Sequence, residues 1–382
     1  MNITEIEIDV VERNLEFVGD NVQDHRGSSA ITGGIVHQGI LRIRTKDGTE
    51  GNCIIGQHRG DSLGKINSVK KFIPYLKNMS VLSSNHLWSS INSMPNFSMN
   101  RFTLDDYSAY SSIDVAIWDL KGKLLNLPVY SLLGGDKRKV KAYGTYQPRH
   151  NNPEGYVEES EEIKNLNLKA YKIHPGPMDT AETIRMVNDV RKNLGKDFYL
   201  MLDPNNSYDL RKALEVGQSL DDNDFFWFED PVRWDDFESI EKIYNKLKTP
   251  LAMTDQADYK FKDINVYSTK AYPQILRGTS RKLGITGLVK ACSVAESSKK
   301  LCEIGTGGNI FFNMANIHVT SSVNNCIFYE YWMPTFSSDF ATIEQIRLDN
   351  KGNVSAFDKS GLGISLDENW IKDNIVDNIK VI

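Results

Sequence analysis

Three acidic residues stand at equal intervals in the middle of the chain, each directly after a short apolar run. Asp203, Glu229 and Asp255 are separated by 26 residues and again by 26. Carboxylates that converge in a partly buried pocket repel one another, so ionising all three there is costly. A hard divalent cation removes that cost, and ligation by oxygen alone suits Mg²⁺. The alternative is that each acid caps a following helix, which explains one acid better than three in succession.

A second group that could do chemistry lies upstream, in the sequence Lys172-Ile173-His174. Because side chains alternate along a strand, Lys172 and His174 share one face, which is the inside of a barrel if Ile173 points outward. An imidazole titrates near physiological pH, so His174 can act as a base; a hydrogen-bonded core histidine is the alternative. Glu330, a fourth acid after an apolar run, could be an ion-pair partner or an acid that donates to a developing oxyanion.

The elements that must position these residues follow a regular rhythm. Strand-like runs begin near Val140, Lys169, Phe198, Phe225, Pro250, Pro273, Lys300 and Ile327. Helix-patterned segments such as 180–193 and 235–248 lie between them, which predicts parallel strands joined by helical crossovers. Eight such strands close into a barrel more naturally than they form an open doubly wound sheet, which is the alternative. In a barrel the chemistry belongs at the carboxyl ends of the strands, where the acids stand.

The two ends of the chain do not share this rhythm. Residues 1–135 contain a predicted hairpin, with strands at 41–45 and 53–55 around Asp47-Gly48, and helices at 66–78, 84–92 and 105–125. The chain after residue 347 is expected to return and pack on this region. We therefore expect three parts: an N-terminal α+β region (1–135), the barrel (136–346) and a C-terminal tail (347–382).

Composition narrows the class of protein. The 382 residues are 40% hydrophobic and 25% charged, which is typical of a soluble globular protein and excludes a disordered one. A net charge of −5 gives no reason to expect nucleic acid or an anionic membrane as a partner. Four cysteines without a CxxC motif read as reduced thiols, and the N-terminus lacks the pattern of a signal peptide. A cytoplasmic protein with a small-molecule substrate is the expectation.

Several motifs, in this order, resemble the mandelate racemase/muconate lactonizing branch of the enolase superfamily over nearly the whole chain. They are residues 112–123 with Gly134-Gly135, Asp203-Pro204-Asn205, Trp227-Phe228-Glu229-Asp230-Pro231, residues 250–255 and residues 361–364. The resemblance implies an α/β fold: a modified TIM barrel, (β/α)₇β, with an α+β capping domain. It also implies one Mg²⁺ on Asp203, Glu229 and Asp255, and abstraction of a proton α to a carboxylate through a metal-stabilised enolate.

The resemblance further implies roles for individual residues. Glu330 matches an acid that hydrogen-bonds the substrate carboxylate, and Asn205 would hold a substrate hydroxyl. A loop at about 15–37, with His25, Arg26 and His37, would cover the pocket and select substrates. Similar proteins are often homo-oligomers.

The chain departs from the family pattern in three places. His174 stands where a lysine base is usual, and Asp255 is shorter than the usual glutamate. The opposite face of the pocket, where many members carry a histidine and an aspartate, has Gly305 and Gly278 as the expected counterparts. Racemisation needs a base on each face of the α-carbon, so these glycines argue against it.

Chemistry with a single base fits the remaining residues. His174, assisted by Lys172, would remove the α-proton, and the β-hydroxyl would leave as water with His174 or Tyr146 as the acid. This is dehydration of a hydroxylated sugar acid to a 2-keto-3-deoxy acid. Cycloisomerisation of a sugar-acid lactone is the nearest alternative, and a member that binds Mg²⁺ and a carboxylate without turnover is an alternative of another class. Arg277 could hold a distal carboxylate of a diacid, or equally form a salt bridge to a barrel acid.

Overall fold

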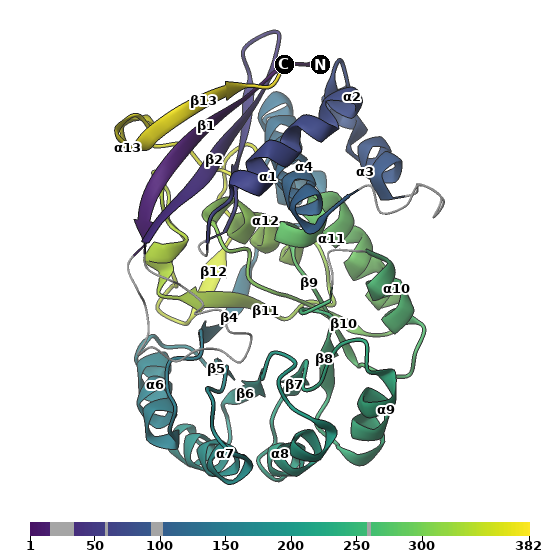
Figure 1. Ribbon diagram of the computed structural model, residues 1–382, viewed down its shortest axis with the longest axis vertical. Helices are drawn as coiled ribbons and strands as arrows, with labels where there is room; N and C mark the ends of the chain where they lie inside the picture. The colour runs from purple at the N-terminus through teal and green to yellow at the C-terminus, as the bar shows by residue number, and fades with distance from the viewer. Residues whose placement is uncertain (16–33, 58–59, 93–101, 258–260) are drawn as a thin grey trace.

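A closed barrel of parallel strands forms the centre of the computed structural model, which describes residues 1–15, 34–57, 60–92, 102–257 and 261–382 (Figure 1). Its strands are β4 (Lys139–Tyr146), β5 (Ala170–Ile173), β6 (Tyr199–Leu202), β7 (Trp227–Glu229), β8 (Leu251–Met253), β9 (Ile275–Gly278), β10 (Leu301–Ile304) and β11 (Phe328–Met333). Each strand begins within two residues of its predicted start. Pairing of β11 with β4 closes the sheet, which excludes the open doubly wound alternative.

Helices alternate with these strands and cover the outside of the barrel. In the described part of the chain they are α6 (Pro153–Asn165), α7 (Thr180–Leu194), α8 (Leu210–Asp222), α9 (Phe237–Lys246), α10 (Phe261–Ser268), α11 (Ser280–Ser297) and α12 (Ile310–Thr320). Eight strands with seven intervening helices give the expected (β/α)₇β order. Asp209 caps α8 and Asp236 caps α9 through their side chains. The strand-end acids before these helices are therefore not their caps.

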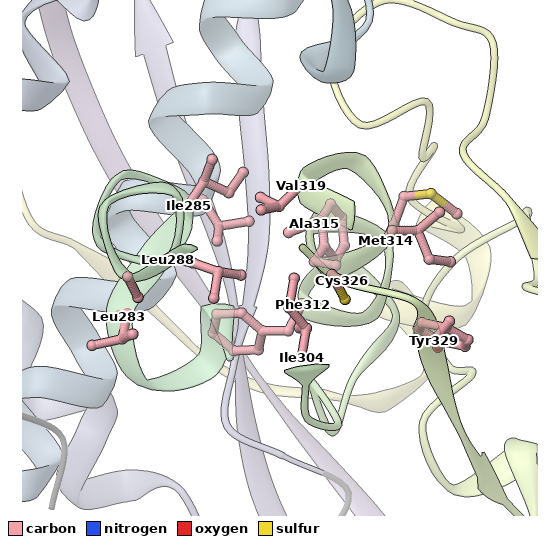
Figure 2. Close-up of a cluster of buried hydrophobic side chains, with 14 of the residues drawn as sticks. Leu283, Ile285, Leu288, Ile304, Phe312, Met314, Ala315, Val319, Cys326 and Tyr329 are labelled. Carbon is pink, nitrogen blue, oxygen red and sulfur yellow. The ribbon is translucent and has the colours of Figure 1, made fainter. Parts of the chain in front are cut away.

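Apolar side chains on the outer face of the strands hold the helices in place. Figure 2 shows one such cluster, to which Leu288 of α11, Ile304 of β10 and Phe312 of α12 belong. Because side chains alternate along a strand, an outward Ile304 directs Gly305 toward the barrel interior. In β5, Ile173 likewise belongs to the outer core, so its neighbours Lys172 and His174 point inward, as the sequence predicts.

A separate antiparallel sheet forms the upper part of the molecule (Figure 1). Its order is β13-β1-β2-β3, made of β1 (Ile3–Leu15), β2 (Gly34–Thr45), β3 (Glu50–Ile55) and β13 (Ile375–Lys380). The β2–β3 hairpin is the one predicted around Asp47-Gly48, and β13 brings the C-terminal tail back onto the N-terminal region. Sequence analysis assigned no strand to residues 1–15.

Helices of the N-terminal region lie between this sheet and the barrel (Figure 1). The remaining described elements are α1 (Leu63–Ser68), η1 (Val69–Phe72), α2 (Ile73–Leu76), η2 (Val81–Ser83), α3 (Ser84–Asn92), α4 (Leu104–Leu125), α5 (Val129–Leu132), η3 (Thr335–Ser337), β12 (Asn353–Ser355) and α13 (Glu368–Asn374). Buried Asp114 of α4 accepts hydrogen bonds from the Thr286 amide and hydroxyl of α11, at 2.9 and 2.6 Å. Buried Asp119 accepts from the amides of Asn52 and Leu362. The capping region is thus fixed to the barrel by buried polar contacts.

Within the described residues, we find no helix that combines the length and the apolar character needed to cross a membrane.

Candidate active site

The carboxyl ends of the barrel strands bring together acidic and basic side chains that are far apart in sequence. Lys172 and His174 lie at the end of β5, Asp203 directly follows β6, Glu229 ends β7, Asp255 lies two residues after β8, and Glu330 lies in β11. Lys172, His174, Asp203, Glu229 and Glu330 are each less than 5% exposed. We call Lys172, His174, Asp203, Glu229, Asp255 and Glu330 together the carboxylate cluster.

Lys172 is the centre of charge compensation in this cluster. Its Nζ lies 3.1 Å from Asp203 Oδ2, 3.2 Å from Glu229 Oε2 and 3.4 Å from Glu330 Oε1. Burial alone would lower the pKa of Lys172, but the three carboxylates together raise it above its ordinary value. Lys172 is therefore a permanent ammonium here, and it supplies charge rather than a neutral base.

His174 is oriented by the neighbouring strand. Its Nδ1 lies 2.7 Å from the Tyr146 carbonyl oxygen and 2.9 Å from Thr145 Oγ1, while its Nε2 lies 3.0 Å from Asp203 Oδ2. The carbonyl oxygen can only accept, so Nδ1 carries a proton and donates it. Nε2 is then the nitrogen that exchanges a proton in the cluster. The ionised form of Asp203 is favoured in return, because Lys172 and His174 outweigh burial and lower the pKa of Asp203.

Arg277 lies beneath the cluster and is fully buried. Its Nε donates to Glu229 Oε1 at 2.9 Å, and its Nη2 donates to Glu330 Oε2 at 2.6 Å and to the Tyr143 hydroxyl at 3.0 Å. Burial raises the pKa of Glu229 well above its ordinary value despite Arg277. The Glu330 pKa is lowered instead, because Lys172 and Arg277 overcome its burial. The sequence left two roles open for Arg277, binding a distal substrate carboxylate or forming a salt bridge to a barrel acid. The structure shows salt bridges to Glu229 and Glu330.

Asp255 lies at the rim of the cluster among different cations. Burial would raise its pKa, but the Lys282 and Arg281 charges lower it. The side-chain amide of Gln256 donates to Asp255 Oδ2 at 3.3 Å and to Asn205 Oδ1 at 3.0 Å. These two hydrogen bonds link the turns after β6 and β8. Asn205 adopts a left-handed backbone conformation (φ 53°). Its backbone N–H donates to Asp203 Oδ1 at 2.9 Å.

The turn that carries Asp255 is held in an uncommon conformation. Thr254 has φ 87°, a region that β-branched residues rarely adopt. Its hydroxyl donates to the Arg277 carbonyl at 2.7 Å and accepts from the Arg277 amide at 3.1 Å. Asp230 accepts hydrogen bonds from the backbone N–H groups of Thr254 and Gln256. Its burial beside Asp203 and Asp255 raises its pKa to about 7. Sequence reasoning missed these positioning residues.

The donor set fits Mg²⁺ in charge and in chemistry. All three predicted ligands offer carboxylate oxygens, and burial, which raises the pKa of Glu229, disfavours its charged form, a cost that a bound cation would offset. In the described residues, however, no three acidic, histidine or cysteine side chains are already spaced as ligands around one point. The Lys172 ammonium lies between Asp203 and Glu229, which explains the spacing. These oxygens must therefore close around a cation by side-chain movement.

Two predicted site residues are not brought into the cluster. The Tyr146 hydroxyl donates to Glu162 Oε2 at 2.9 Å, and Arg149 stacks on its ring, so this phenol faces α6 and does not reach the cluster as an acid. The His37 ring lies 2.7 Å from Asp61 and contacts no residue of the cluster. Predicted His25 and Arg26 lie outside the described residues.

Most of the chain matches the family that the motifs suggested. A family profile described as Enolase C-terminal domain-like matches residues 155–370, and a profile described as Mandelate racemase / muconate lactonizing enzyme, N-terminal domain, matches residues 30–134. The chain belongs to the mandelate racemase/muconate lactonizing branch of the enolase superfamily.

Relatives in this superfamily include dehydratases and cycloisomerases. An arabinonate dehydratase from Saccharolobus solfataricus is 27% identical over 259 residues, covering 67% of this chain and 69% of that protein. A D-galactarolactone cycloisomerase from Agrobacterium fabrum is 30% identical over 149 residues, covering 38% of this chain and 39% of that protein. The crystal structure of D-glucarate dehydratase from Agrobacterium tumefaciens complexed with magnesium superposes with a TM-score of 0.82 at 25% identity, covering 99% of this chain and 100% of that chain.

The resemblance predicted Gly305 and Gly278 on the face of the site opposite His174. A Cβ on Gly305 would lie 2.8 Å from Asp255 Oδ1 and 3.6 Å from Glu330 Oε2, so this glycine borders the cluster. A Cβ on Gly278 would instead meet Leu288 of α11 at 3.1 Å. Gly278 therefore faces the outer core, and the expectation that it replaces an inward acid is wrong. Arg277 is the inward residue of this strand end.

Proposed function

We propose that this protein catalyses Mg²⁺-dependent dehydration of a hydroxylated sugar acid to a 2-keto-3-deoxy acid. The observation that carries the proposal is the position of His174. Its Nδ1–H is fixed on the Tyr146 carbonyl oxygen, and its Nε2 faces the carboxylate cluster at the carboxyl end of the barrel. An oriented imidazole of this kind can take a proton and return it.

Asp203, Glu229 and Asp255 would hold the cation. When bound, Mg²⁺ would supply a charge that stabilises the negative charge developing on the substrate carboxylate. Lys172, held as an ammonium by its ion pairs, adds positive charge at the same place. Glu330 lies 3.4 Å from the Lys172 ammonium and would border the substrate carboxylate.

His174 performs both proton transfers in this proposal. Nε2 takes the α-proton, and the electron pair of the broken C–H bond moves into the carboxylate as an enolate. Nε2 then donates its proton to the β-hydroxyl, which leaves as water while the α,β double bond forms. The resulting enol becomes the 2-keto-3-deoxy acid. No second base is required, which agrees with Gly305 on the opposite face.

Exchange of the α-proton tests this assignment. We expect the wild-type protein with Mg²⁺ to exchange the α-proton of its sugar acid with deuterated water, followed by NMR. His174→Ala should abolish exchange, whereas His86→Ala, at an exposed histidine of α3, should leave it unchanged. Normal exchange in His174→Ala would show that another residue is the base.

Cycloisomerisation of a sugar-acid lactone is the second candidate. It needs the same α-proton abstraction, and a relative named as a D-galactarolactone cycloisomerase supports it. Incubation with aldonates, aldarates and lactones, with products identified by NMR, separates a 2-keto-3-deoxy acid from a ring-opened isomer. If none is converted while the same compounds stabilise the fold, the protein binds Mg²⁺ and carboxylates without turnover.

A further inference from the structure

Arg281 lies at the rim of the candidate site, three residues after β9. Its Nε donates to the Thr306 carbonyl oxygen at 3.0 Å, just beyond the end of β10. Its Nη2 lies 3.9 Å from Asp255 Oδ2, after β8. Its side chain is only 15% exposed. The guanidinium is therefore fixed above three neighbouring strand ends, next to a predicted metal ligand.

Most hydrogen-bonding capacity of this guanidinium is not used by the protein. A guanidinium has five N–H donors, and among the described residues Arg281 makes one hydrogen bond and one long ion pair. Among the described residues no hydrogen bond engages its two terminal nitrogens, and the side chain is 15% exposed. The planar pair of terminal nitrogens can therefore receive a carboxylate in a bidentate manner.

The charge around Asp255 also favours an anion. Arg281 Nη2 lies 3.9 Å from Asp255 Oδ2, and the Lys282 ammonium donates to the Asp255 carbonyl oxygen. In the proposed function Asp255 shares its charge with Mg²⁺ as well, which leaves this side of the site with excess positive charge. A second negative group on the substrate would offset that excess.

Arg277 is excluded from this task by its contacts. It is fully buried, and its donors are engaged by Glu229, Glu330, the Tyr143 hydroxyl and the Glu303 carbonyl. A substrate carboxylate could reach it only by breaking these pairs, which are costly to break inside a protein. Arg277 makes four hydrogen bonds to these partners, whereas Arg281 makes one among the described residues.

We propose that Arg281 binds the distal carboxylate of a dicarboxylic sugar acid, so that the substrate class is an aldarate rather than an aldonate. The inference rests on the proposed function, in which the other carboxylate of the same molecule lies at the cation. It assigns to Arg281 the distal-carboxylate role that the sequence suggested for Arg277.

Matched substrates test this proposal. D-Glucarate and D-gluconate differ only at C6, as do galactarate and D-galactonate. We expect Arg281→Gln to lower kcat/KM for the converted aldarate about 100-fold, mainly by raising KM, because a charged partner of a carboxylate is lost. Activity on any converted aldonate should change less than about threefold, and Arg281→Lys should recover part of the aldarate activity. Arg211→Gln, at an exposed i,i+4 pair on α8, is the control.

Binding measurements separate this proposal from the reaction. Calorimetry of D-glucarate and galactarate in the presence of Mg²⁺ needs no turnover. If the wild-type protein binds an aldarate without converting it, and Arg281→Gln loses that binding, the substrate class stands while the proposed reaction fails. Equal loss for aldarates and aldonates in Arg281→Gln, unchanged aldarate binding, or a wild-type preference for aldonates would each overturn the proposal.

Discussion

Replacing Lys172 by methionine should destabilise the metal-free protein far more than the loss of one surface charge would. The Lys172 ammonium is 2% exposed and lies within 3.4 Å of oxygens from Asp203, Glu229 and Glu330. Lys172→Met keeps most of the side-chain volume but leaves three buried carboxylates without this cation. Removing one partner of a buried ion pair costs about 3–5 kcal/mol, and we expect a loss in that range at pH 7.5.

Magnesium should reverse much of this loss, because the cation supplies the missing positive charge at the same carboxylates. A ligand present at one hundred times its Kd stabilises the folded state by about 2.7 kcal/mol. Mg²⁺ should bind Lys172→Met more tightly than it binds the wild type, since no ammonium competes for Asp203 and Glu229. The deficit of the metal-free variant should also shrink as the pH falls, because carboxylates without the ammonium take up protons at higher pH.

Urea unfolding followed by tryptophan fluorescence, in EDTA and in excess Mg²⁺, measures the loss of stability and its reversal by Mg²⁺. The same measurement at lower pH shows whether the loss shrinks. Lys242→Met is the control, since this lysine pairs with Glu238 on the exposed surface of α9 and should leave the midpoint unchanged. Metal-free Lys172→Met within 1 kcal/mol of the wild type would refute the role given to the ammonium. So would a deficit that Mg²⁺ leaves intact, because the cation would then act at another place.

Further predictions concern the cation and the barrel core. Asp203→Asn should abolish Mg²⁺ binding in calorimetry with little change in the urea midpoint; unchanged affinity would remove Asp203 from the ligand set. Gly305→Ala should weaken Mg²⁺ binding about 10- to 100-fold, because the new Cβ lies 2.8 Å from Asp255 Oδ1, while Gly278→Ala, which faces a flexible leucine, should not. Burial raises the pKa of Glu303 to about 7 from 4.5, so stability falls as the pH rises through this interval, by about 3 kcal/mol in total. Glu303→Gln should flatten urea midpoints measured between pH 5 and 8, and parallel profiles would contradict this.

The barrel could be predicted because its signal is local and repeated. Each strand start lies within two residues of its predicted position, because eight buried apolar runs alternate with seven helices at nearly constant spacing. Alternation along β5 also placed Lys172 and His174 on the inner face once Ile173 was taken as outward. Strand β1 was missed, although Ile6, Ile8 and Val10 alternate with polar residues in it.

Contacts between distant strand ends could not be predicted in the same way. Arg277 meets Glu229 and Glu330, which lie 48 and 53 residues away, and only the closed barrel decides that these pairs form. Tyr146 could have been placed by alternation. Tyr143 belongs to the inner core, so Tyr146, three residues later, faces the helices, where it meets Arg149 and Glu162. The sequence therefore leaves open which strand-end side chains pair with one another, because that depends on the closed barrel.

The short third acid and the missing second base have a common geometric cause. The Asp255 carboxylate lies against Gly305, and a side chain at that position would begin 2.8 Å from Asp255 Oδ1, closer than non-bonded atoms approach. A histidine on this strand end and the present placement of Asp255 are therefore mutually exclusive. Thr254 holds the backbone next to Asp255 through two hydrogen bonds to the Arg277 backbone. In the proposed function proton transfer is confined to the His174 face, which would permit elimination or ring opening and not the two-sided exchange that racemisation requires.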